Sequence, residues 1–352
     1  MRIGIVNDML IARTALQRAV LSVPGHSVAW LARDGAEAVE LAKSDRPYLI
    51  LMDLIMPVVD GVEATRRIMH ASPCPIVIVT SSVSGHMGKV YEAMGLGALD
   101  AVDTPELGPS GDLAGAKILL AKIETVAKLI GRAPRVVLDH LADGPVRAKL
   151  DAPPSWPLMV IGSSTGGPAA LAEILIELPE NRDSTTVIVQ HVDVAFAPGL
   201  ARWLYEKTGR KVDLVEVGAT PLPGQILIAA TNDHVILDTS LRFRYVAEPV
   251  AMHYRPSVDV FFQTVADHWP VPGAAALLTG MGRDGAAGLL ALRRAGWLTI
   301  AQDEVSSVIW GMPGSAVQLD AANHVLPLSK IARAMTEHIR KRSRILPGDH
   351  RP

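Results

Sequence analysis

Cysteine is almost missing from this chain of 352 residues, because Cys74 is its single representative. One cysteine excludes an intramolecular disulfide and a metal site made of several cysteines, and we expect a buried apolar thiol. Long apolar runs are missing too, since no stretch approaches the ~20 apolar residues of a membrane span. The amino-terminal MRIGIVND is typical of a strand and not of a secretory leader. These absences predict a cytoplasmic protein without membrane insertion.

A strong excess of charge of either sign is also absent. Lys and Arg together number 34 and Asp and Glu 36, for a formal net charge of −2. This balance gives no electrostatic reason to expect nucleic acid or an anionic membrane as a partner. The hydrophobic content of 49% is that of an ordinary soluble protein, and 352 residues favour two domains.

The amino-terminal half alternates short apolar runs with segments of helical periodicity. Strands are expected at residues 3–6, 27–31, 48–52, 76–79 and 98–102, with helices between them. Five βα repeats within residues 1–125 predict a five-stranded parallel sheet. In such a sheet the functional groups gather at the carboxyl ends of the strands.

Two carboxylates and a hydroxyl fall at these strand ends. Asp8 follows the first strand, Asp53 ends the third and Thr80 ends the fourth. Either aspartate alone is more simply explained as a helix cap. Together they predict an acidic pocket whose hard oxygen atoms suit Mg²⁺.

The same region resembles the receiver domain of two-component response regulators. The resemblance rests on MDLIMP at residues 52–57 with Asp60-Gly61, VTSS at 79–82 and GALD at 97–100. It implies that Asp53 accepts a phosphoryl group from a histidine kinase. It also implies that Asp8, Asp53 and the carbonyl of Ile55 hold Mg²⁺, and that Thr80 binds a phosphoryl oxygen.

Three positions depart from the usual receiver pattern. Asn7 replaces one of two acidic residues after the first strand, Thr104 replaces a lysine before a proline, and Ala101 replaces an aromatic switch residue. Loss of the lysine removes a cation that would contact the phosphoryl group. The three departures resemble a variant from chemosensory systems that control a diguanylate cyclase and surface behaviour.

The carboxyl-terminal half restarts the alternation at Leu158. Strands are expected at residues 158–161, 186–189, 212–217, 225–229, 235–237, 274–278 and 298–301. They predict a second, doubly wound and mainly parallel α/β domain. We assign residues 1–125 to the first domain, 126–157 to a linker that is irregular from Gly131 onward, and 158–345 to the second domain.

The first strand of this second domain ends in the sequence GSSTGGP at residues 162–168. Gly162 to Gly166 matches the pattern G-x-S-x-G, in which a serine between a strand and a helix amino-terminus acts as nucleophile. The same sequence pattern also occurs in ordinary Gly/Ser loops and in loops that bind phosphate. The motif alone therefore leaves its function open.

A histidine and an aspartate follow two other strands. His191 comes directly after residues 186–189 and is placed to take a proton from Ser164, although His234, His253, His268, His324 and His338 compete for that role. Asp284 would either orient the histidine or cap the helix that starts near Gly285. The order Ser, His, Asp differs from the α/β-hydrolase order, in which the acid precedes the histidine.

These motifs together resemble the catalytic domain of chemotaxis protein-glutamate methylesterases. The similarity extends to HYRPSVD at residues 253–259, AQDE at 301–304 and WGMP at 310–313, and a receiver precedes this domain in that family. It implies Ser164 as nucleophile, His191 as general base and acid, and Asp284 as the orienting carboxylate. It further implies an oxyanion contact from the Met281 N–H and a substrate groove lined by Thr165, His253, Tyr254 and Arg255.

The implied reaction is hydrolysis of glutamate γ-methyl esters, with deamidation of glutamines, on the cytoplasmic domain of a chemoreceptor. It needs no cofactor, whereas phosphorylation of the receiver by the histidine kinase of the chemosensory array needs Mg²⁺. Our hypothesis is that the unphosphorylated receiver covers the Ser164 cleft. The alternatives are a receiver-regulated adaptor that only sequesters a partner and a generic acyl esterase.

Overall fold

The computed structural model describes residues 1–352 except 109–112, 131–153, 181–182, 251, 253 and 346–352. The chain divides into two compact units, 1–133 and 134–352, each with its own hydrophobic core. Most of the predicted linker at 126–157 lies outside the described residues. Its first five residues, 126–130, belong to helix α5 (Ala116–Ile130).

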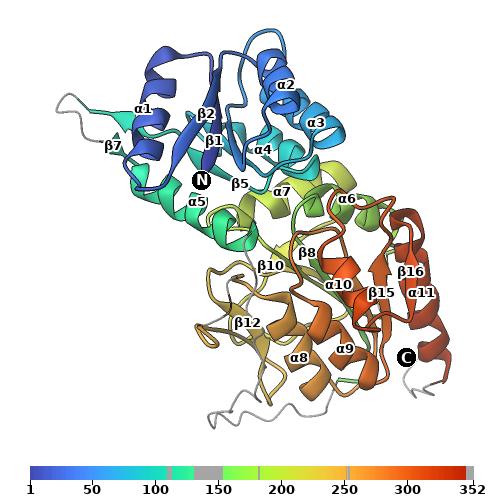
Figure 1. Ribbon diagram of the computed structural model, residues 1–352. Helices are drawn as coiled ribbons and strands as arrows, with labels where there is room; N and C mark the ends of the chain where they lie inside the picture. Colours follow the sequence, from blue (N-terminus) through green and yellow to red (C-terminus); the bar gives the residue numbers. More distant parts are fainter. Residues whose placement is uncertain (109–112, 131–153, 181–182, 251, 253, 346–352) are drawn as a thin grey trace. The chain divides into compact units, whose positions relative to one another are not determined.

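The amino-terminal unit is the predicted five-stranded parallel sheet, in the order β2-β1-β3-β4-β5 (Figure 1). Its strands are β1 (Arg2–Val6), β2 (Ser27–Ala32), β3 (Leu49–Met52), β4 (Ile76–Thr80) and β5 (Asp100–Asp103). Its other helical segments are α1 (Leu10–Leu21), α2 (Gly35–Ser44), α3 (Gly61–Ala71), the 3₁₀ turn η1 (Ser84–His86) and α4 (Met87–Gly95). A short antiparallel hairpin, β6 (Glu106–Leu107) with β7 (Leu113–Ala114), was not predicted.

One close approach fixes the loop after β3. A Cβ on Gly61 would lie 1.9 Å from the carbonyl oxygen of Asp53, so α3 can start here only with glycine. Asp60 caps the same helix by accepting a hydrogen bond from the N–H of Glu63 at 3.0 Å. The helix start therefore packs directly on the loop that carries Asp53.

The carboxyl-terminal unit contains a seven-stranded parallel sheet in the order β10-β11-β9-β8-β14-β15-β16. Its strands are β8 (Leu158–Ser163), β9 (Thr185–Gln190), β10 (Asp213–Leu214), β11 (Ile226–Ile228), β14 (Ala274–Leu277), β15 (Leu298–Gln302) and β16 (His324–Leu326). Its helices are α6 (Gly167–Glu177), α7 (Ala197–Thr208), α8 (Val258–His268), α9 (Ala286–Arg294), α10 (Met312–Gln318) and α11 (Leu328–Ile345). The sequence did not predict β16, α10 or α11.

One expected strand does not join this sheet. Residues 235–237 belong to β12 (His234–Leu237), which pairs antiparallel with β13 (Phe243–Val246) in a separate hairpin. The tight turn between them is closed by Asp238, whose N–H donates to the carbonyl of Arg242 at 3.0 Å. A short connection of this kind joins antiparallel strands only, because parallel neighbours need a long crossover.

Parallel strand order determines where the functional loops meet. β8 pairs with β9 on one side and with β14 on the other, with Ser163 opposite Gln190 and Gly162 opposite Leu277. The loops that follow these three strands therefore start at one edge of the sheet.

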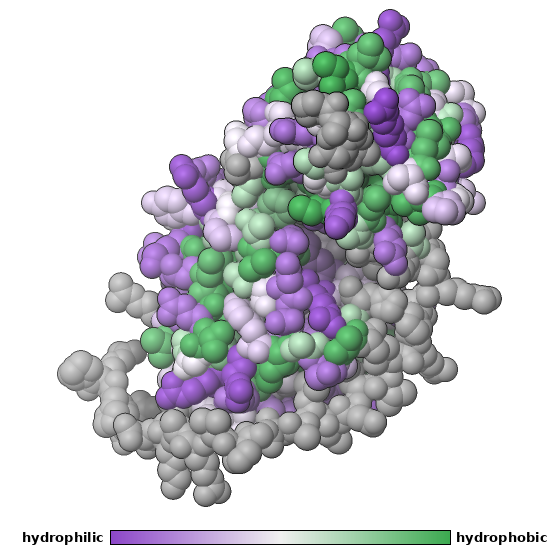
Figure 2. Space-filling view, turned by 90° about the vertical axis from the view of Figure 1, so that its left-hand side faces the viewer, coloured by the Kyte–Doolittle hydropathy of each residue, from purple (hydrophilic) through white to green (hydrophobic). Residues whose placement is uncertain are grey.

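On the face in Figure 2, hydrophilic and hydrophobic residues alternate over short distances. Within the described ranges, no helix is both long enough and apolar enough to cross a bilayer.

Substitution of Gly273 tests the tight packing of β14 on β8. A Cβ at Gly273 would lie 1.9 Å from the carbonyl oxygen of Leu158, so Gly273→Ala is expected to destabilise the carboxyl-terminal unit by about 1–3 kcal/mol. Gly88→Ala in α4 is the control, because a Cβ there has nothing within 4 Å. The free energy of unfolding of each unit is measured for both variants by amide hydrogen exchange at increasing denaturant concentration. The same free energy of opening for the β8 amides in wild type and in Gly273→Ala would contradict the prediction.

Candidate active site

β8 runs into a turn that presents Ser164. All six residues of the strand are buried, and Ser164 directly after it is half-buried. Gly166 follows with φ of +78°, a conformation that favours glycine. A Cβ there would also come within 2.7 Å of the Val308 side chain. Both the backbone conformation and the lack of space for a Cβ therefore require glycine at position 166. The turn leaves Ser164 at the amino-terminal end of α6.

Gln190 holds this turn against the neighbouring strand. Its fully buried side chain donates from Nε2 to the carbonyl oxygens of Ser164 at 2.9 Å and His191 at 3.1 Å. Its Oε1 accepts a hydrogen bond from the hydroxyl of Ser163 at 2.7 Å. Gly167 packs so closely that a Cβ there would lie 2.0 Å from Oε1. The sequence showed Gln190 only as part of a motif, and this clamp is visible only in the structure.

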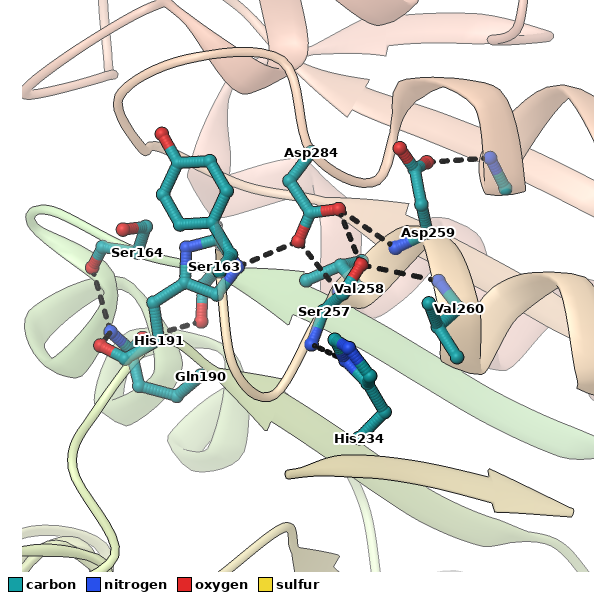
Figure 3. A network of polar contacts seen from close by, with 12 residues as sticks. Ser163, Ser164, Gln190, His191, His234, Ser257, Val258, Asp259, Val260 and Asp284 are labelled. Carbon is teal, nitrogen blue, oxygen red and sulfur yellow. Dashed lines mark hydrogen bonds and ion pairs between the residues drawn. The ribbon is translucent and has the colours of Figure 1, made fainter. Parts of the chain in front are cut away.

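His191 and Asp284 form a buried pair at the ends of β9 and of the loop after β14. The His191 Nε2 and Asp284 Oδ2 atoms lie 2.7 Å apart (Figure 3), with side-chain exposures of 9% and 2%. The ring of Tyr254 stacks on the imidazole, with 4.2 Å between ring centroids and 15° between planes. The Tyr254 hydroxyl donates to the carbonyl of Met281 at 3.1 Å. The pair is therefore covered on one face by an aromatic ring that is itself fixed.

Asp284 does not cap the helix that follows it. The N-cap of α9 is Gly285, with no side-chain hydrogen bond. Instead, Asp284 accepts hydrogen bonds from the first turn of α8: at Oδ2 from the N–H of Val258 at 2.7 Å, and at Oδ1 from the N–H of Asp259 at 3.1 Å. The hydroxyl of Ser257 also donates to Oδ1, at 2.7 Å. The amino-terminal end of α8 thus supplies donors and a favourable helix dipole to this carboxylate.

These donors separate the pKa values of two neighbouring carboxyl groups. Burial raises the pKa of Asp284, but the hydrogen bonds from His191, Ser257 and Val258 outweigh it and lower the pKa below its usual value. Burial and the nearby Asp284 charge raise the pKa of Asp259 well above its usual value, although its carboxylate accepts from the N–H of Gly288 at 2.7 Å. Asp284 is therefore the more readily ionised of the two carboxyl groups, and Asp259 keeps its proton to a higher pH.

The other ring nitrogen of His191 lies toward the serine. Figure 3 shows the imidazole between Ser164 and Asp284. The Nδ1 atom is buried and has no hydrogen-bond partner among the described residues, Ser164 included. Because Nε2 is engaged by Asp284, Nδ1 remains to accept a proton. Such bonds are often open in unliganded sites and close when substrate binds.

The loop after β14 lies directly against the nucleophile. A Cβ on Gly280 would be 2.8 Å from the Cβ of Ser164. No acceptor among the described residues bonds the N–H of Met281, the next residue. Thr165 is only 4% exposed, and its carbonyl accepts from the hydroxyl of Thr279 at 2.9 Å. These contacts place Met281 and Thr165 beside the serine turn.

Arg255, another residue expected in the substrate groove, has no contact with the Ser164 turn among the described contacts. Arg255 donates to the carbonyl of Val250 at 3.2 Å and lies 3.8 Å from Asp233. His253 lies outside the described residues. Of the competing histidines, His234 is buried behind Ser257, and His268 contacts the carbonyl of Leu237 at 2.8 Å. His191 alone of these is paired with Asp284 in the described contacts.

The receiver unit gathers its expected polar residues around Asp53. This side chain is 8% exposed and accepts hydrogen bonds from the N–H of Leu54 at 2.7 Å and the amide of Asn7 at 2.8 Å. Burial raises the pKa of Asp53 to about 6, although the backbone hydrogen bonds lower it. The charge of exposed Asp8 raises it further. The Thr80 hydroxyl is buried without a partner among the described residues. Asn7 was noted in the sequence as a departure, and its contact with Asp53 was not foreseen.

Comparisons with known proteins agree with both halves of the chain. Residues 159–335 match the family described as CheB methylesterase, and residues 3–106 match the response regulator receiver domain. Protein-glutamate methylesterase/protein-glutamine glutaminase 3 of Pseudomonas aeruginosa is 49% identical over 340 residues, which cover 96% of this chain and 99% of that protein. The corresponding protein of the group 3 operon of Pseudomonas putida is 50% identical over 341 residues, covering 97% and 100%. The chain therefore belongs to the CheB family of protein-glutamate methylesterase/protein-glutamine glutaminases that carry an amino-terminal receiver domain.

Proposed function

We propose that this protein hydrolyses glutamate γ-methyl esters, and deamidates glutamines, on the cytoplasmic domain of a chemoreceptor. The observation that carries the proposal is the meeting of Ser164, His191 and Asp284 at the carboxyl ends of adjacent parallel strands. The reaction needs no cofactor, because an activated serine and a polarised carbonyl suffice. The protein acts in the cytoplasm, where that receptor domain lies.

The hydrolytic steps follow from the contacts of the site. The Ser164 hydroxyl attacks the γ-carbonyl carbon while His191 Nδ1 takes its proton, and the Nε2–H donated to Asp284 stabilises the resulting imidazolium. The N–H of Met281 and the amino-terminal end of α6 stabilise the tetrahedral oxyanion. His191 then protonates the departing methanol, or ammonia from a glutamine. Water, activated by the same nitrogen, releases the glutamate.

The receiver regulates this hydrolysis through phosphorylation of Asp53 by a histidine kinase. Burial raises the pKa of Asp53, and the nearby charge of Asp8 raises it further. These two carboxylates and the carbonyl of Ile55 are the kind of oxygen donors that Mg²⁺ prefers. Bound Mg²⁺ supplies charge neutralisation for the attack of a carboxylate on phosphorus. The buried and unpartnered Thr80 hydroxyl is suited to donate to a phosphoryl oxygen.

We also propose that the pathway is of the kind that controls a diguanylate cyclase. The support lies in Asn7, Ala101 and Thr104, which replace an acidic, an aromatic and a lysine residue of the usual receiver. Asn7 occupies one oxygen of Asp53 with an amide N–H where another carboxylate would repel it.

Replacement of the nucleophile tests the enzymatic proposal. Ser164→Ala is expected to reduce methanol release from methylated receptor membranes by at least about 10³-fold, with or without a small-molecule phosphodonor. Ser163→Ala is the matched control, because its hydroxyl contacts Gln190 and not the reacting atoms, and a much smaller loss is expected. Methanol release by Ser164→Ala at the wild-type rate would contradict the proposal. Hydrolysis of p-nitrophenyl acetate without methanol release would indicate a generic esterase, and no hydrolysis at all would indicate an adaptor.

The buried charge of Asp53 predicts a pH-dependent stability of the receiver. The pKa of Asp53 is about 6 in the folded receiver and 3.8 in the unfolded chain, so folding favours the protonated side chain. The stability that Asp53 contributes to the receiver is therefore fully present below about pH 4 and is lost as the pH rises through 6. Asp53→Asn retains an acceptor for Asn7 and carries no charge. In Mg²⁺-free buffer it should melt above wild type at pH 8 and equal it near pH 4. The same melting difference at both pH values would contradict this prediction.

A further inference from the structure

We propose that Ser257 and His234 are positioning residues of the hydrolytic site, which fix the carboxylate of Asp284 and, through it, the ring of His191. This inference rests on the proposed role of the Ser164, His191 and Asp284 group. In Figure 3 they form a second layer behind Asp284, on the side away from Ser164.

Ser257 links the start of a helix to the carboxylate. Its fully buried hydroxyl donates to Asp284 Oδ1 at 2.7 Å and accepts from the N–H of Val260 at 3.3 Å, as the N-cap of α8. One hydroxyl therefore sets both the first turn of α8 and one oxygen of Asp284. The N–H groups of Val258 and Asp259 reach the same carboxylate from that turn.

His234 anchors Ser257 from the other side. This fully buried residue of β12 accepts the backbone N–H of Ser257 at Nδ1, at 3.2 Å, and its Nε2 lies 3.3 Å from the carbonyl of Pro249. The two contacts together assign the proton to Nε2 and leave Nδ1 as an acceptor. Burial lowers the pKa of His234, which favours the neutral ring that this role requires.

Replacement of Ser257 or His234 is expected to change the position of the Asp284 carboxylate and not the binding of substrate. Neither Ser257 nor His234 contacts Ser164 in the described structure, whereas every donor to Asp284 other than His191 comes from the turn that they hold. A displaced turn would withdraw donors from an ionised carboxylate that lies beside a second carboxyl group, Asp259. The His191 ring would then lose its fixed orientation.

The experiment compares two pairs of variants in the full-length protein. Ser257→Ala and His234→Leu remove the hydroxyl and the ring acceptor, whereas Ser257→Thr and His234→Asn retain a hydroxyl and an acceptor near the same places. We measure kcat and KM for methanol release from methylated receptor membranes. We also record the low-field proton resonance of the His191 Nε2–H, and thermal melting as a control for folding.

Ser257→Ala and His234→Leu are expected to lower kcat by about 10- to 100-fold with little change in KM, and to shift or broaden the resonance. Ser257→Thr and His234→Asn should recover most of both. The inference is overturned if the removing variants keep the wild-type kcat and resonance, or if the retaining variants are as impaired as the removing ones. If wild type itself releases no methanol, the proposed function fails. The resonance and the rate of Ser164 labelling by a fluorophosphonate would then still test the positioning role.

Discussion

A buried, ionised carboxylate at Asp284 is the constraint on which the hydrolytic unit depends. Removing an aspartate from water disfavours its charged form, and an unpaired charge at this depth would be lost to protonation. Here His191, a serine hydroxyl and the first N–H groups of α8 all donate to it. Burial and the charge of Asp284 raise the pKa of the neighbouring carboxyl group of Asp259, so Asp259 gives up its proton less readily than Asp284 does. The negative charge is therefore held on Asp284, with Oδ2 against His191 and Oδ1 against the hydroxyl of Ser257.

The rest of the unit brings a serine to the other side of the imidazole. The parallel order of β9, β8 and β14 starts three loops at one edge, and Gln190 joins two of them through a single buried amide. Glycines at positions 166, 167 and 280 allow backbone and side chains to approach within distances that a Cβ would forbid. The resulting turn holds Ser164 by backbone contacts, while its hydroxyl stays available for reaction.

Local patterns predicted those parts of the molecule that follow from local chemistry. Apolar runs gave the two parallel sheets, and polar residues just after them indicated Ser164, His191, Asp284 and Asp53. Whether Asp284 caps its own helix could not be decided from the sequence, because its partner is the start of α8, about 25 residues earlier in the chain. For a related reason, the strand at residues 235–237 was predicted but its antiparallel pairing with β13 was not. A lone apolar run does not specify its pairing partner.

The supporting residues were missed because they carry no pattern of their own. His234 lies in a short strand of the hairpin, and Ser257 looks like any N-cap; only the return of α8 to the sheet edge places them behind Asp284. Gln190 was seen beside His191 but not as a clamp on the serine turn, because its three contacts depend on the register of β8 against β9.

The protonation state of Asp284 tests this account most directly. It can be followed by the ¹³C chemical shift of the aspartate side-chain carboxyl carbons, assigned with Asp284→Asn and Asp259→Asn. The account predicts that from about pH 5 to 8 the Asp284 carbon stays at the ionised position, and that the Asp259 carbon reaches its own ionised position at a higher pH than the Asp284 carbon does. A shift of Asp284 to the protonated position within that range would contradict it.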